Sequence, residues 1–179
     1  MKRSLALLIG IAAATIALVG TAYFGSEPPA APSLPDGSVE RLFASQFNDS
    51  DGKAQELAQW RGKTLVINFW ASWCPPCREE IPGFSRLQTK YAANNVQFVG
   101  IALDSADNVS RFTQQQAVGY PLLIGGAPAS ELAQQLGNAS MALPYTVVLG
   151  AAGDVRLARL GRVGEGELDD LLAGTSSRQ

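Results

Sequence analysis

The chain has 179 residues, 46% of them hydrophobic, a formal net charge of −2 and no histidine. This length is enough for one well-buried domain, and without a basic stripe we expect no nucleic-acid partner. The absence of histidine excludes Cys–His nucleophilic pairs and histidine metal ligands, and two cysteines alone cannot complete a tetrahedral zinc site. We therefore expect no metal and no cofactor.

The N-terminus contains a candidate membrane segment. Lys2 and Arg3 precede an apolar stretch from Leu5 to Phe24. As a helix this stretch would span about 30 Å, the thickness of the bilayer core, and the preceding positive charge favours an N-terminus that stays inside. We expect residues 1–25 to be a signal anchor, with the remainder exported; a signal peptide cleaved near residues 20–22 is the alternative.

Residues 26–37 contain four prolines among small residues. This composition is typical of a semi-rigid, extended linker. We expect the globular domain to occupy residues 38–179.

The first elements of that domain are short. Two strands, Ala44–Phe47 and Lys53–Gln55, are expected to form a hairpin around the turn residues 48–52. Residues 56–60 then form a helical turn. The run Thr64–Trp70 is apolar, β-branched and aromatic, and it predicts a buried central strand.

Cys74 and Cys77, the only cysteines, follow this strand closely. If a helix begins at Cys74, both lie within one turn, with Cβ atoms about 5–6 Å apart, slightly farther than a disulfide requires. Unpaired N–H groups at the helix start would stabilise a thiolate, so we expect a lowered thiol pKa at Cys74. Pro75 and Pro76 suit a helix start. We expect Cys74 to be the attacking thiolate and the deeper Cys77 to be the resolving thiol.

After the cysteines, helices and strands alternate. A helix over Arg78–Ala92, kinked at Pro82, leads to a strand over Val96–Leu103 that is parallel to the first because a helix connects them. The remaining elements are a helix over Asn108–Gln116, a strand over Pro121–Ile124, a helix over Ser130–Leu136, a hairpin of Tyr145–Leu149 with Val155–Leu160, and a closing helix over Gly164–Ala173. This order predicts an α/β domain with a mixed sheet covered on both faces.

Three segments, Val66–Pro82, Val99–Asp104 and Leu143–Thr146, resemble the thioredoxin fold and, more narrowly, the TlpA/ResA-like family of exported thiol-disulfide oxidoreductases. The resemblance covers about residues 40–173. It implies a thioredoxin fold with a mixed central sheet, an N-terminal β-hairpin extension and a strand–helix insertion in the centre, preceded by the N-terminal apolar helix. It also implies that Cys74–Cys77 is a redox-active disulfide.

The resemblance implies a role for Pro144. It matches the proline that forms a cis peptide bond opposite the cysteines in this fold, where exposed backbone can pair with an extended substrate. A trans proline that begins a strand is the alternative. Leu143 and Tyr145 differ from the small or hydroxylated neighbours that are common at these positions.

Glu80 and Asn68 occupy positions that bear on how protons are transferred during exchange. Glu80 matches an acidic residue near the thiols of ResA-like members, which could accept or supply protons during exchange; a solvated residue paired with Arg78 or Arg86 is the alternative. Asn68 stands where cytoplasmic thioredoxins have a buried aspartate. Since asparagine does not titrate, proton transfer falls to Glu80 or to water.

The three tryptophans are expected to have different roles. Trp73, directly before the first cysteine, would form a partly exposed wall that shields the sulfur and contacts the partner. Trp70 is expected in the core, and Trp60, on the short turn before the strand, is also expected to be a packing residue.

The leading hypothesis is a thiol-disulfide oxidoreductase that reduces disulfides of periplasmic partner proteins. We expect it in the bacterial inner membrane, crossing once through residues 5–24, with its catalytic domain in the periplasm. A soluble periplasmic protein is the alternative if the signal is cleaved. The resemblance implies a membrane electron donor of the DsbD/CcdA type and a task in cytochrome c biogenesis.

Two other functions stay open. A peroxiredoxin-like peroxide reductase shares the fold, but Ala71 stands where such enzymes resemble one another in having a threonine. A non-catalytic binding module with a structural disulfide is the second, although so short a loop gains little stability from cross-linking.

Overall fold

The computed structural model describes residues 33–176. The predicted membrane segment over residues 1–25 and most of the predicted linker lie outside this range. Among the helices of residues 33–176, none is both long enough and apolar enough to cross a bilayer.

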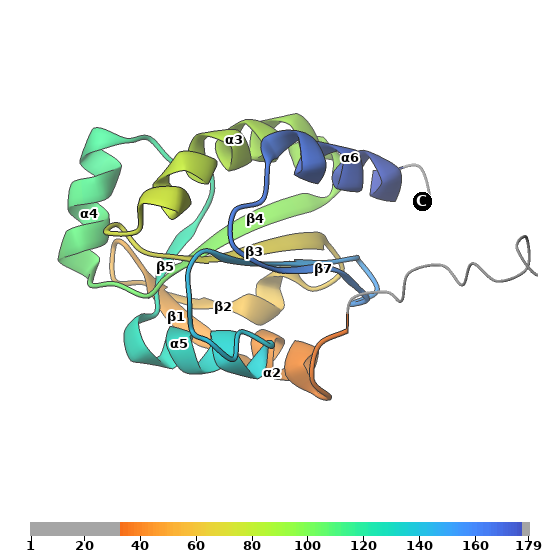
Figure 1. Cartoon of the computed structure of the whole chain (residues 1–179), viewed down its shortest axis with the longest axis horizontal. Coiled ribbons are helices and arrows are strands. Elements are labelled where there is room, and N and C mark those ends of the chain that lie inside the picture. The colour runs from red at the N-terminus through yellow and green to blue at the C-terminus, as the bar shows by residue number, and fades with distance from the viewer. Residues whose placement is uncertain (1–32, 177–179) are drawn as a thin grey trace, which may run out of the picture. The chain divides into compact units, whose positions relative to one another are not determined.

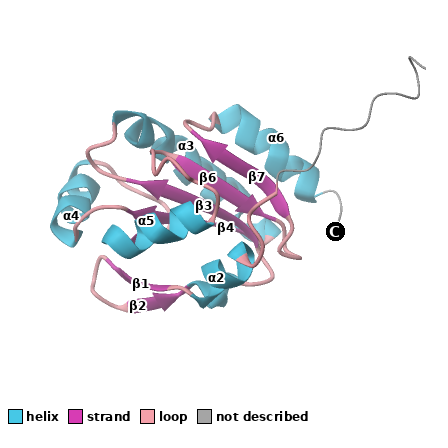
Figure 2. Cartoon of the chain, turned by 60° about the horizontal axis from the view of Figure 1, so that its bottom comes forward, coloured by secondary structure: helices cyan, strands magenta, loops and turns pink. Residues whose placement is uncertain are grey.

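The described residues form five α-helices and one seven-stranded sheet, seen in Figures 1 and 2. The helices are α2 (Ser38–Ala44), α3 (Pro75–Tyr91), α4 (Ala106–Gln115), α5 (Gly126–Gln135) and α6 (Glu165–Ser176), with short 3-10 turns η1 (Leu57–Trp60) and η2 (Ala92–Asn94). The strands are β1 (Gln46–Asp49), β2 (Ala54–Glu56), β3 (Thr64–Trp70), β4 (Val96–Ala102), β5 (Leu122–Ile124), β6 (Tyr145–Leu149) and β7 (Val155–Leu160).

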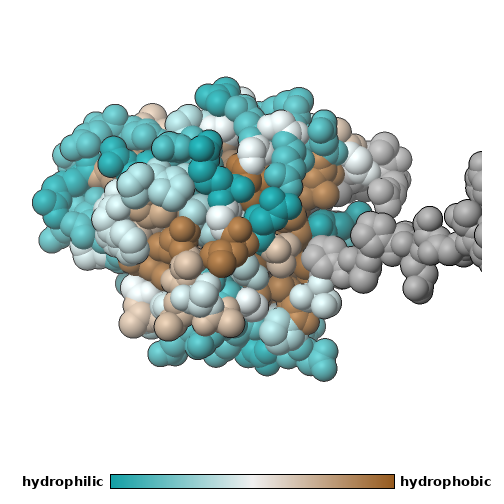
Figure 3. Space-filling view, in the orientation of Figure 1, coloured by the Kyte–Doolittle hydropathy of each residue, from teal (hydrophilic) through white to brown (hydrophobic). Residues whose placement is uncertain are grey.

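The sheet is mixed, with the strand order β2-β1-β5-β4-β3-β6-β7. Strand β3 pairs in parallel with β4 and antiparallel with β6, and β5 is parallel to β4. Helices α3 and α6 cover one face, and α2 and α5 cover the other (Figure 1). Hydrophilic residues predominate on the outer helices, while hydrophobic residues show between them (Figure 3). This is the expected α/β thioredoxin-like fold, with the β1–β2 hairpin added through β5.

Strand β3 is buried along its whole length. It contributes side chains to two hydrophobic cores, one on each face of the sheet. Because side chains alternate across a strand, Val66 and Trp70 enter the core beneath α3, whereas Leu65 and Phe69 enter the core above α5. Asn68 has the same parity as Val66 and Trp70, so its side chain faces α3, the helix that begins beside the cysteines.

The N-terminal boundary differs from the prediction. Residues 38–44 form helix α2, which sequence reasoning missed, so β1 begins at Gln46 rather than at Ala44. Strand β2 is likewise shifted by one residue. Helix α2 has only seven residues and no side-chain cap at its first residue, so periodicity and capping give no signal for it. Its stability comes from burial of Leu42 and Phe43.

Helix α5 begins at Gly126, four residues earlier than expected. The glycines and Pro128 of this segment resemble a loop in sequence. Proline is nevertheless compatible with the first helical turn, whose N–H groups need no helical acceptor. Gly126 itself has a φ of 50°.

Helix α3 continues through Pro82 without interruption. Proline has no N–H to donate to the carbonyl four residues earlier, which is that of Arg78. That carbonyl instead accepts a 3.4 Å hydrogen bond from Gln116 Nε2, just beyond α4. The proline therefore frees a contact point between α3 and α4.

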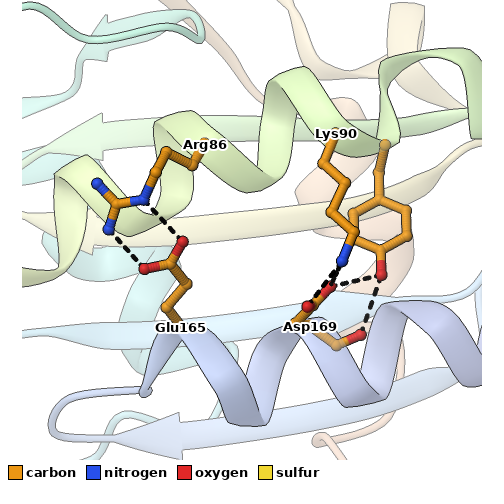
Figure 4. Close-up of polar contacts among 5 residues, drawn as sticks. Arg86, Lys90, Glu165 and Asp169 are labelled. Carbon is orange, nitrogen blue, oxygen red and sulfur yellow. Dashed lines mark hydrogen bonds and ion pairs between the residues drawn. The ribbon is translucent and has the colours of Figure 1, made fainter.

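Ion pairs link the outer surfaces of α3 and α6 (Figure 4). Arg86 Nε donates to Glu165 at 2.8 Å, and Lys90 Nζ donates to Asp169 at 2.7 Å. The Tyr91 hydroxyl also donates to Asp169. These contacts join α6 to α3 at the surface, although exposed pairs of this kind add little stability.

Candidate redox site

Cys74 and Cys77 form a disulfide at the start of α3, with an S–S distance of 2.09 Å and a Cα–Cα distance of 5.4 Å. Cys74 has extended backbone angles and is the cap residue, so the helix itself begins at Pro75. The Cys77 backbone N–H points at Cys74 Sγ, 3.4 Å away. A helix N-terminus therefore faces the first sulfur, as the sequence indicates.

The two cysteines differ in access. Cys74 retains 4% of its exposed area and Cys77 retains none. Trp73, beside Cys74, is 66% exposed, which is more open than the partly exposed wall predicted for it. Trp70 and Trp60 are buried, as predicted. A partner would therefore meet Trp73 and Cys74 before it could reach Cys77.

Pro144 lies beside the loop that carries the cysteines. Phe69 of β3 pairs with Tyr145 of β6, so the residue before Tyr145 stands next to Trp70, where β3 ends. The Leu143–Pro144 peptide bond is cis, as the resemblance implies, and the alternative of a trans proline is wrong.

Glu80 is buried rather than solvated, so the alternative of a surface ion pair is wrong. Its Oε1 accepts a 2.7 Å hydrogen bond from Asn68 Nδ2, and its Oε2 accepts one of 3.2 Å from the Val163 backbone N–H. Asn68 Nδ2 also donates to Thr146 Oγ1 at 3.1 Å. One turn beyond Cys77, a carboxyl group thus takes part in a buried polar network.

Burial raises the pKa of Glu80 from 4.5 to about 7, against the smaller lowering effects of its hydrogen bonds from Val163 and Asn68 and of the charge on Arg162. Desolvation disfavours the charged form of a carboxyl group. Near neutral pH this group is therefore divided between its protonated and ionised forms, as a proton donor and acceptor should be.

Asp104 holds the loop before the cysteines. Its Oδ2 accepts hydrogen bonds from the Ser72 backbone N–H at 3.0 Å and from Ser72 Oγ at 2.6 Å. Its Oδ1 accepts from the Ser105 backbone N–H and from Asn108 Nδ2. Burial raises the pKa of Asp104, but the bonds from Ser72 and Asn108 outweigh it and lower the pKa overall.

Sequence reasoning missed three contributors to this site: Asp104, Thr146 and the backbone N–H of Val163. A signal existed for Asp104, because the carboxyl ends of adjacent parallel strands meet at the same edge of a sheet. The Val163 contact spans 83 residues and involves only backbone on its donor side. No residue type marks such a contact in a sequence.

The described residues offer no evident metal site, since no group of three or more cysteine or acidic side chains within 33–176 is placed to bind an ion. A cavity of about 610 Å³ lies elsewhere, lined by residues of the β1–β2 hairpin, by Gln59 and Trp60, and by residues between 113 and 122. Neither cysteine lines it. A groove of about 350 Å³ is lined in part by Ser72 and Trp73, which directly precede Cys74.

Comparison with known proteins agrees with this geometry. The Redoxin family matches residues 29–172. The chain is similar to the thiol-disulfide oxidoreductase ResA of Bacillus subtilis, with 27% identity over 124 residues, 69% of this chain and 68% of that protein. It is 35% identical to ResA of Bacillus thuringiensis subsp. konkukian over 77 residues, 42% of this chain and 44% of that protein. In this second comparison the chain spans less than half the length of its relative.

A solved structure also resembles this one. The thioredoxin-related protein from Neisseria meningitidis serogroup B is 32% identical, with a TM-score of 0.65, and the match covers 74% of this chain and 99% of that one.

Proposed function

This chain belongs to the Redoxin family, and we propose that it is a thiol-disulfide oxidoreductase that reduces disulfides in partner proteins. The observation that carries the proposal is the Cys74–Cys77 disulfide at the start of α3, with the Cys77 N–H directed at Cys74 Sγ. The similarity to ResA proteins supports it.

The reducing reaction begins with the dithiol form of the protein. The Cys74 thiolate attacks one sulfur of a partner disulfide, forms a mixed disulfide and releases the other partner sulfur as a thiolate, which takes up a proton. Cys77 then loses its proton and attacks Cys74 Sγ, which breaks the mixed disulfide. The partner leaves with two thiols, and two electrons have passed to it as the Cys74–Cys77 bond forms.

Glu80 supplies the proton acceptor in this scheme. It lies three residues beyond Cys77 and therefore on the same face of α3. Its pKa of about 7 leaves enough carboxylate at neutral pH to accept the proton of Cys77. Asn68 cannot titrate, but its amide holds the Glu80 carboxyl through Oε1.

We place this reaction outside the bacterial cytoplasm, on a domain tethered to the inner membrane by residues 5–24. The charge pattern around that segment supports export. A membrane donor of the DsbD/CcdA type would return two electrons to the Cys74–Cys77 disulfide. Partner proteins of cytochrome c biogenesis are candidate substrates.

Redox titration of the purified protein tests the direction of the reaction. A potential near that of thioredoxin, about −270 mV, supports a reductant, whereas one near that of DsbA, about −120 mV, would reverse the direction. Failure of the reduced protein to reduce any protein disulfide would reject the proposed activity altogether.

A further inference from the structure

A groove beside the disulfide carries positive charge that the exchange chemistry does not use. It lies between the first turn of α3 and helix α4, which are neighbours in Figure 1, and its lining includes Trp73, Arg78 and Arg111. We propose that this arginine groove binds acidic side chains flanking the reactive cysteine of a partner protein. The inference rests on the proposed function, because it names the partner segment that the same site selects.

The arginine groove is continuous with the disulfide. Ser72 and Trp73, which form one wall, immediately precede Cys74. Consecutive residues of an extended peptide advance by about 3.3 Å. A partner whose cysteine meets Cys74 therefore places residues only two or three positions away within reach of the groove.

The opposite wall is fixed in place at both ends of α4. Before its first turn, Asp104 accepts two hydrogen bonds from Ser72. Just past its last turn, Gln116 donates to the Arg78 carbonyl that Pro82 leaves free. The groove is thus formed by the fold itself, and its two arginines stand on walls that are tied together.

Neither arginine is neutralised by a carboxylate. Within residues 33–176, the Arg78 guanidinium makes no hydrogen bond or ion pair, and Arg111 bonds only to the neutral oxygens Asn108 Oδ1 and the Asp107 carbonyl. Other arginines of the same face are paired: Arg162 with Glu79 and Arg86 with Glu165.

Of the acidic residues around the groove, Asp104 and Glu79 are engaged, and the exposed Asp107 on the first turn of α4 meets Arg111 only through its backbone carbonyl. Asp104 accepts hydrogen bonds from Ser72, Ser105 and Asn108, and Glu79 is paired with Arg162 at 2.7 Å. The unsatisfied charge of Arg78 and Arg111 is therefore available to a partner.

The chemistry of the lining indicates what would bind. Guanidinium groups present a planar fork of donors that matches a carboxylate. Trp73 adds an exposed aromatic surface on which the aliphatic part of a peptide side chain can pack. An acidic segment next to a cysteine satisfies both features, whereas a basic segment would be repelled.

The test compares three peptides of equal length, each with one disulfide and with Asp, Asn or Lys at the second and third positions on either side of the reactive cysteine. The full-length protein is reduced, and its second-order rate constant for reducing each peptide is measured at low ionic strength. The same is done for the double variant Arg78→Gln/Arg111→Gln. A charge-matched control, Arg61→Gln/Lys63→Gln, removes two cations just before β3, about 20 Å from its cysteine-bearing end.

We expect the wild type to reduce the Asp peptide about fivefold faster than the Asn peptide, since each exposed charge contact contributes modestly. Added salt should lower this ratio. The ratio should fall to about 1 in Arg78→Gln/Arg111→Gln and persist in the control.

Three outcomes would each contradict acidic binding by the arginine groove without affecting the proposed oxidoreductase function. They are equal rates on the Asp and Asn peptides in the wild type, an undiminished ratio in the double variant, and fastest reduction of the Lys peptide. If the wild type reduces none of the peptides, the proposed function itself fails and the inference fails with it.

Discussion

The two faces of the central sheet differ in what strand β3 buries on each of them. Toward α5, strand β3 contributes Leu65, Ile67 and Phe69, all fully buried and all apolar. Toward α3, the same strand contributes Asn68, which bonds to the buried Glu80. One face gains stability from apolar burial, and the other places ionisable chemistry in the protein interior at some cost in stability.

The cost is visible in unpaired polar atoms. Among the described residues, Asn68 Oδ1, Trp70 Nε1 and the Tyr120 hydroxyl are buried without a hydrogen-bond partner. Trp70 and Tyr120 belong to the core beneath α3, and Asn68 faces the same side through its bond to Glu80. Buried polar atoms without partners are destabilising, so this face is arranged for reactivity rather than for maximal stability.

The largest effect that distinguishes the two faces should come from removing the attacking sulfur on the α3 side. Cys74→Ser should lower the rate of insulin reduction to background, a loss of about a thousandfold or more, because no second nucleophile can start the exchange. The protein should remain folded by circular dichroism. Retention of more than a few percent of the activity would contradict the assigned role of Cys74.

Removing bulk from the other face should act on stability alone. Ile67→Ala deletes part of a fully buried side chain and should lower the free energy of unfolding by about 3 kcal/mol, through lost burial and the cavity left behind. Urea denaturation measures this change. Activity per folded molecule should stay at the wild-type level, and a selective loss of activity would mean that the two faces are coupled.

Glu80 should make stability depend on pH. Its pKa is about 7 in the folded protein and 4.5 as the ordinary value, so between these two values the native state binds more protons than the unfolded state. Stability therefore falls as pH rises through that window, by about 3 kcal/mol in total. Glu80→Gln should abolish this fall, as measured by urea denaturation of the oxidised protein from pH 4 to pH 8.

A neighbouring carboxyl group provides the matched control. Glu79 is exposed and paired with Arg162, and Glu79→Gln should keep the wild-type decline in stability with pH. If Glu80→Gln declines as steeply as the wild type, the carboxyl is not the buried titrating group described above. In reduction assays, Glu80→Gln should also lose a pH dependence centred near 7.

The smallest effect is expected on the outer surface. Arg86→Gln breaks the exposed pair with Glu165 that joins α3 to α6. Because exposed pairs are screened and entropically costly, the melting temperature should change by no more than the scatter of repeated melts. A clear drop would mean that the docking of α6 depends on this contact.

Much of the fold was predictable because its signals are local. The uniform burial of β3 follows from its apolar and β-branched run, and the helix start at the cysteines follows from Pro75 and Pro76. The site was partly predictable: Cys74 and Cys77 lie where the sequence indicates. The prediction of a cis peptide bond before Pro144 came from the family resemblance rather than from composition.

What the sequence did not reveal depends on tertiary contacts. Helix α2 is too short to show a period and is stabilised by burial. Residue type alone leaves Glu80 either solvated or buried, since the outcome is decided by Asn68 on β3 and by the distant backbone of Val163. The same holds for the bond between Asp104 and Ser72, which joins residues 32 positions apart.

The central claim is that Cys74 attacks a partner disulfide as a thiolate and that Cys77 then attacks Cys74 Sγ to release the partner. Its most direct test is to reduce the protein with dithiothreitol, treat it briefly with limiting iodoacetamide at pH 7, and locate the label by mass spectrometry. We predict complete reduction of the bond and labelling at Cys74 at least tenfold faster than at Cys77. A bond that resists dithiothreitol, or a Cys74 that labels no faster than an ordinary exposed thiol, would contradict the exchange mechanism.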